Sequence, residues 1–111
     1  MTPAARLSAA MELLDAILRG EPAERALTRW ARASRFAGSK DRAAIRDIVF
    51  DCLRQRRSLG WLGGGDTGRA LVLARAAAEG EDLDALFTGR GFDPEPVSQA
   101  ERAALAGDLA A

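Results

Sequence analysis

Arginines at helical spacing are the side chains of this 111-residue chain best suited to a chemical task. Six of the sixteen basic residues lie between Ser39 and Arg57. If this segment is one capped amphipathic helix, Arg46, Arg54 and Arg57 share a face with Phe50, beside an apolar stripe. Guanidinium groups bind phosphate oxygens, and an aromatic ring stacks on unpaired bases. The spacing therefore predicts a ridge that contacts RNA.

An ordinary solvent-exposed helix face would show a similar pattern, with its arginines paired to nearby carboxylates such as Asp51 with Arg54. The distribution of charge favours RNA over this alternative. Residues 1–60 hold 12 basic and 7 acidic side chains, whereas residues 61–111 hold 4 basic and 9 acidic ones. Arg25, Arg29 and Arg32 add to the basic side of the chain. The residues predicted to contact the RNA backbone are Arg35, Lys40, Arg42, Arg46, Arg54 and Arg57.

Few residues suit catalysis or cofactor binding. The chain has no histidine and one cysteine, Cys52, which falls in an apolar stripe with Ile45, Val49 and Leu53 and is predicted to pack in the core. The glycine-rich segment 63–68 lacks the Gly-Lys-Ser/Thr that completes a phosphate-binding loop, so we expect a flexible loop there. We predict no catalytic, cofactor-binding or metal-ligating residue.

Alanine, leucine and arginine dominate the composition, and aromatic and β-branched residues are few, which predicts an all-α fold. Thr2 and Pro3 are typical of a helix start, as are Ser39 and the Ser98–Glu101 pair. The predicted helices span about 3–19, 22–33, 39–57, 69–79, 82–87 and 99–109.

Several segments follow one another in an order that can be compared with known families. They are Leu13–Leu18, Ala23–Leu27, Arg35–Arg42, the apolar positions Ile45, Ile48, Val49 and Phe50, then Leu53-Arg54 and Leu59, and finally Ala85–Gly89 with Phe92-Asp93-Pro94. This order resembles the NusB-type helical domain. More narrowly, it is similar to the N-terminal domain of the RsmB/NOP/Sun family of bacterial ribosomal RNA cytosine-C5 methyltransferases.

The resemblance implies a NusB-like helical bundle built of two small sub-bundles. Residues 1–88 would form an RNA-binding domain, and residues 89–111 a linker and first helix leading toward an absent methyltransferase domain. That domain would use S-adenosylmethionine, and this chain would position ribosomal RNA for it. The paired catalytic cysteines of the family have no counterpart here, so we expect no catalysis by this chain itself.

Two other functions stay open. The chain could be a protein-interaction module that docks on its own catalytic domain, with a possible dimer through exposed apolar surface. It could also be a stand-alone transcription antitermination factor of NusB type. A single cysteine and the absence of any apolar run of about 18 residues predict a soluble, cytoplasmic protein that does not bind membranes.

Overall fold

The computed structural model describes residues 1–110, with side chains to residue 107, and this part of the chain is helical without any strand. The all-α prediction is thereby confirmed. None of the helices is both long and apolar enough to cross a membrane. The seven helices are α1 (Pro3–Leu18), α2 (Ala23–Ala33), α3 (Ser39–Arg54), α4 (Arg56–Gly63), α5 (Gly68–Ala78), α6 (Leu83–Leu86) and α7 (Gln99–Ala110).

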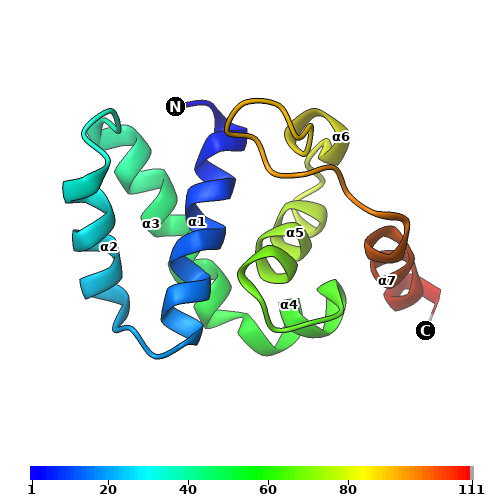
Figure 1. The fold of residues 1–111 in the computed structure, drawn as a ribbon. Helices are drawn as coiled ribbons and strands as arrows, with labels where there is room; N and C mark the ends of the chain where they lie inside the picture. The colour runs from blue at the N-terminus through cyan, green and yellow to red at the C-terminus, as the bar shows by residue number, and fades with distance from the viewer. Residues whose placement is uncertain (111) are drawn as a thin grey trace.

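Helix α1 lies at the centre of the fold. Helices α2 and α3 pack on one side of it and α5 on the other, while α4 and α7 pack beyond α5 (Figure 1). The largest fully buried side chains all come from α1, α3 and α5, so these three helices make the centre of the core. They are Leu13, Leu14, Ile45, Val49, Cys52, Leu71, Val72 and Leu73.

The helix starts follow from local hydrogen bonds, which is why most of them were predictable. The hydroxyl of Thr2 accepts the amide hydrogen of Ala5 at 3.1 Å and so caps α1. At α7, Ser98 and Glu101 each accept the other's amide hydrogen, at 2.9 and 3.1 Å, which completes the predicted capping box. The sequence also predicts that Leu109 belongs to the apolar face of this helix, but its side chain lies outside the described ones.

Helix α3 begins at Ser39, as predicted, but Ser39 does not cap it. Gly38 holds the cap position, and the carboxylate of Asp41 accepts the Gly38 amide hydrogen at 3.1 Å. Asp41 is buried and also binds the Arg6 guanidinium of α1, at 2.8 Å. Because the Gly38 amide and Arg6 both stabilise its charged form, the pKa of Asp41 is lowered. One carboxylate thus caps α3 and ties it to α1.

Glycine sets the distance between α5 and α1. A Cβ atom on Gly68 would lie 2.2 Å from the carbonyl oxygen of Met11, so no larger residue fits there. The Gly68 amide donates a hydrogen bond to Asp15 at 2.8 Å, which satisfies a free amide at the start of α5. At Gly63, a Cβ would lie 2.4 Å from the Ala70 carbonyl oxygen. The predicted glycine-rich loop is therefore a closely packed corner between three helices.

The segment after α6 folds back onto the bundle. Arg69 of α5 donates hydrogen bonds to Glu101 at 2.7 and 3.0 Å and to the carbonyl oxygens of Glu95 and Pro96. Leu105 packs against the core from α7. Val97 and Leu105 of this segment thus pack against the core of the preceding helices, and Arg69 and the Arg102–Asp84 ion pair tie the segment to the bundle.

We expect Gly68→Ala to lower the free energy of unfolding by about 3 kcal/mol or more, because the added methyl must push α5 away from α1. Gly107→Ala is the matched control, since its Cβ would meet nothing within 4 Å and alanine favours helix. Urea denaturation followed by circular dichroism measures both. Equal midpoints for the two variants would contradict the packing argument.

The Arg69–Glu101 pair predicts a pH-dependent stability. Hydrogen bonding to Arg69 lowers the pKa of Glu101 to about 2 from 4.5, so its stabilisation is complete above pH 4.5 and is lost as the pH falls toward 2. Glu101→Gln should cost about 1–2 kcal/mol at pH 7. The difference in urea midpoint between wild type and variant should shrink between pH 4.5 and 2.5; a constant difference would contradict the assignment.

Candidate nucleic-acid interface

The predicted arginine ridge is split between two helices. Helix α3 ends at Arg54, Gln55 leaves helical geometry with φ −109° and ψ 21°, and α4 begins at Arg56. Arg57 therefore belongs to α4 and does not continue the face of α3, so the prediction of one helix to residue 57 is wrong. The physical reason is packing, because the break lets α4 turn back and bury Leu59 against α5.

Two ridge arginines are held by carboxylates. Arg46 donates hydrogen bonds to both carboxylate oxygens of Glu24 in α2, at 3.0 and 2.5 Å, and lies 4.9 Å from the centre of the Phe50 ring. The contact lowers the pKa of Glu24 and raises that of Arg46. Arg54 pairs with Asp51, as the solvent-face alternative predicted. A phosphate would have to compete for either arginine.

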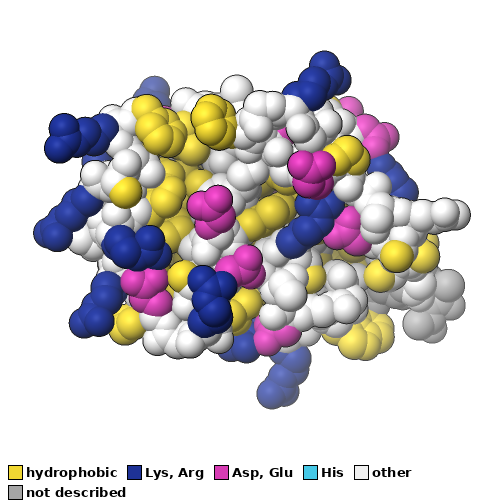
Figure 2. Space-filling view, in the orientation of Figure 1, with side chains coloured by type: hydrophobic (Ala, Val, Ile, Leu, Met, Phe, Trp, Pro, Cys, Tyr) yellow, Lys and Arg dark blue, Asp and Glu magenta, His cyan; other side chains and the backbone are white. Residues whose placement is uncertain are grey.

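The other predicted contacts are available to a ligand. Arg35, Lys40 and Arg42 are exposed, and none of them forms an ion pair with a carboxylate of residues 1–107. The same holds for Arg25 and Arg32 on α2, which stand seven residues apart and so face one way. We call these five side chains the α2–α3 cationic face. Figure 2 shows Lys and Arg side chains gathered along this edge of the molecule, on the left.

A groove separates α2 from α3 beside the cationic face. It has a volume of about 270 Å³, and α2 contributes the half-buried ring of Trp30 to its wall. Arg42 and the paired Arg46 and Glu24 line it too. Trp30 also packs partly against the core, and the helical period of α2 alone does not reveal that its ring borders an open groove.

Three more aromatic side chains are exposed on the surface. Phe36, in the connection between α2 and α3, is 72% exposed, Trp61 of α4 is 70% exposed, and Phe92, between α6 and α7, is 83% exposed. Arg57 stands one turn before Trp61 on the same helix and makes no ion pair within residues 1–107. Phe36 lies between Arg35 and Lys40 in the chain, so an apolar ring belongs to the cationic face.

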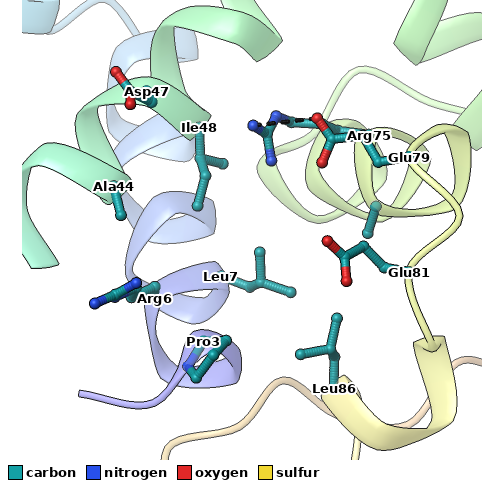
Figure 3. A pocket seen from close by; sticks show the side chains of 11 residues that line it. Pro3, Arg6, Leu7, Ala44, Asp47, Ile48, Arg75, Glu79, Glu81 and Leu86 are labelled. Carbon is teal, nitrogen blue, oxygen red and sulfur yellow. Dashed lines mark ion pairs between the residues drawn. The ribbon is translucent and has the colours of Figure 1, made fainter.

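A second depression, of opposite charge, lies between α1, α3, α5 and α6. Leu7, Ile48 and Leu86 line it, and Glu81 points into it (Figure 3). It has a volume of about 310 Å³. We call it the acidic hollow; the residues around it are Pro3, Arg6, Leu7, Ala44, Asp47, Ile48, Arg75, Ala76, Glu79, Glu81 and Leu86.

Only some of the charged side chains around the acidic hollow have an ion-pair partner in the described part of the chain. Arg75 binds Asp51 at 2.9 Å and Glu79 at 3.4 Å, so its positive charge is compensated within the protein. Asp47 and Glu81 have no ion-pair partner among residues 1–107. The hollow therefore presents apolar surface with uncompensated negative charge.

The groups that suggested enzyme chemistry in the sequence have structural roles. Cys52 is fully buried, and burial raises the pKa of its thiol to about 12. The Gly68 amide, which opens α5 after the glycine-rich segment, is already bound by Asp15. That helix start therefore offers this amide to no phosphate.

Comparison of the chain with protein-family models, curated proteins and solved structures finds no significant match.

Burial predicts that the Cys52 thiol is inert in the folded protein. At pH 8 we expect its reaction with 5,5′-dithiobis(2-nitrobenzoate) to be at least about 100-fold slower than in 6 M guanidinium chloride, because the thiolate is disfavoured and covered. The release of coloured thionitrobenzoate measures both rates. A native rate similar to the denatured one would show that the site opens easily.

Proposed function

We propose that this chain binds RNA through the α2–α3 cationic face. The observation that carries the proposal is that the cations of this face have no ion-pair partner among residues 1–107, although ion pairs are common elsewhere in this part of the chain. Uncompensated surface cations repel one another, and phosphates relieve that repulsion while releasing condensed counterions. Four of the five cations are arginines, which suit bidentate contacts with phosphate.

The ion pairs of the structure change the set of residues that we expect to contact RNA phosphates. Arg35, Lys40 and Arg42 remain primary candidates, and Arg25 and Arg32 join them. Arg46 and Arg54 become secondary, because a phosphate must first displace Glu24 or Asp51. Arg57 is available but lies on α4, apart from this face.

We further propose that the RNA is ribosomal and that the chain works together with a methyltransferase domain. Its support is the resemblance of the segment order to the N-terminal domain of the RsmB/NOP/Sun family, together with the all-α fold. A separate domain would bind S-adenosylmethionine and carry out the methylation of cytosine. The role of this chain is to hold and orient the RNA, and none of its residues takes part in the reaction.

The acidic hollow favours a second function, docking of a protein partner. Apolar walls next to the free carboxylates of Asp47 and Glu81 suit a segment that carries a basic side chain beside an apolar one. The catalytic domain of a longer protein could supply such a segment. This function uses a different surface from RNA binding, so the two are compatible.

The proposal predicts that Arg25→Ala, Arg32→Ala and Arg42→Ala together weaken binding of a fluorescein-labelled ribosomal RNA hairpin. Each lost phosphate contact removes about 0.7 to 0.9 from the slope of log K against log salt, so the triple variant should lose about 2. Fluorescence anisotropy between 50 and 200 mM salt measures the slope.

The matched control removes the same charge from arginines that have carboxylate partners and are not among the candidate contacts, through Arg29→Ala, Arg56→Ala and Arg102→Ala. Its slope should stay near that of wild type. Equal losses in both triple variants would mean that only net charge matters. Absence of binding by wild type at 50 mM salt would exclude the proposed function.

A further inference from the structure

We infer that the groove between α2 and α3 captures one unpaired base of the RNA, which stacks on Trp30 while Arg42 binds its phosphate. This inference rests on the RNA-binding function proposed above and adds what part of the RNA is recognised. Trp30, which is only half-buried, thereby gains a function in addition to packing against its neighbours.

The size of the groove limits what it can hold. Its volume of about 270 Å³ lies just below the range of about 300–1,000 Å³ found for drug-sized ligands, which fits a single planar ring system with a few attached atoms. Trp30 is half-buried, so the indole is held in place by its neighbours and still borders the open space. A fixed aromatic ring in a groove of this size suits stacking of one base.

The charges of the groove suit a nucleotide better than an uncharged ring. Arg42 is exposed on its rim without a carboxylate partner among residues 1–107. The only carboxylate that lines the groove, Glu24, would repel a phosphate, but two hydrogen bonds from Arg46 neutralise it. Arg46 is itself fixed by Phe50, so this neutralisation is built into the fold. A base can therefore enter while its phosphate meets a net positive rim.

The paired strands of an RNA helix cannot supply this base, because its faces are already stacked on its neighbours. Only a loop, a bulge or a single strand presents a base that can leave the stack. The inference therefore predicts preference for unpaired RNA. The remaining cations of the α2–α3 cationic face would bind phosphates on either side of the captured nucleotide.

The test uses the fact that the chain has two tryptophans, Trp30 and Trp61. Trp61→Phe leaves Trp30 as the sole indole reporter, and Trp30→Phe leaves Trp61. Each variant is titrated with a single-stranded 12-nucleotide adenylate and with a blunt RNA duplex of equal charge, while anisotropy of labelled RNA reports binding independently. Inorganic polyphosphate at the same charge concentration shows whether emission changes without a base.

We expect the single strand to quench Trp30 emission by at least half at saturation, with little effect of duplex or polyphosphate. Trp30→Leu should weaken single-strand binding by about 5- to 150-fold, and Trp30→Phe by less, because phenylalanine still stacks. Circular dichroism of each variant shows whether it folds. Quenching of Trp30 in the Trp61→Phe protein is measured without any substitution in the groove. Base capture can therefore still be tested if the Trp30→Leu variant does not fold.

Other outcomes separate this inference from the proposed function. Binding seen by anisotropy without quenching of Trp30, equal quenching by polyphosphate, or quenching of Trp61 alone would overturn base capture and leave RNA binding intact. Tighter binding of duplex than of single strand would do the same. No binding of any RNA at 50 mM salt would overturn both.

Discussion

The contact between the start of α5 and the middle of α1 is the constraint on which the rest of the structure depends. Gly68 lies so close to the Met11 carbonyl oxygen that only a hydrogen fits between them, and Asp15 accepts the Gly68 amide hydrogen at 2.8 Å. This contact brings Leu71 and Leu73 into the core beside α1. Since α4 and α7 pack beyond α5, their positions follow from the same contact.

Folding also decides which arginines remain available for a ligand. Arg69 of α5 lies beside Glu101 of α7, and Arg75 of α5 lies beside Asp51 of α3, where the partners are 32 and 24 residues apart in the chain. On the α2 side, Arg46 binds Glu24 across the groove, whereas Asp41, between Lys40 and Arg42 in the chain, is bound by Arg6 instead. Net charge is zero for the whole chain. The cationic face therefore arises from the local excess of basic residues in 1–60 and from uneven pairing, and not from a basic chain as a whole.

Local sequence patterns predicted the parts of the fold that local interactions determine. The Thr2 cap and the Ser98–Glu101 box depend on neighbours within one helical turn, and the apolar stripe that contains Cys52 marks the face of α3 that packs into the core. The Arg46–Glu24 pair was not predictable, because it requires knowing that α2 and α3 lie side by side. The misplaced Arg57 has a similar cause: the break at Gln55 carries no glycine or proline, and α4 separates from α3 because it packs on α5.

Helix α3 forms a wall shared by two depressions of opposite charge. Arg42 and Arg46 line the groove toward α2, while Asp47 and Ile48 line the acidic hollow toward α1 and α5. If the proposed RNA binding holds, a strand that approaches α3 would be attracted to one side of the helix and repelled from the other. The repulsion would limit the orientations in which phosphates can engage, since Asp47 has no ion-pair partner among residues 1–107. Carboxylates of the acidic hollow would then help to direct RNA to the groove, even though they make no contact with it.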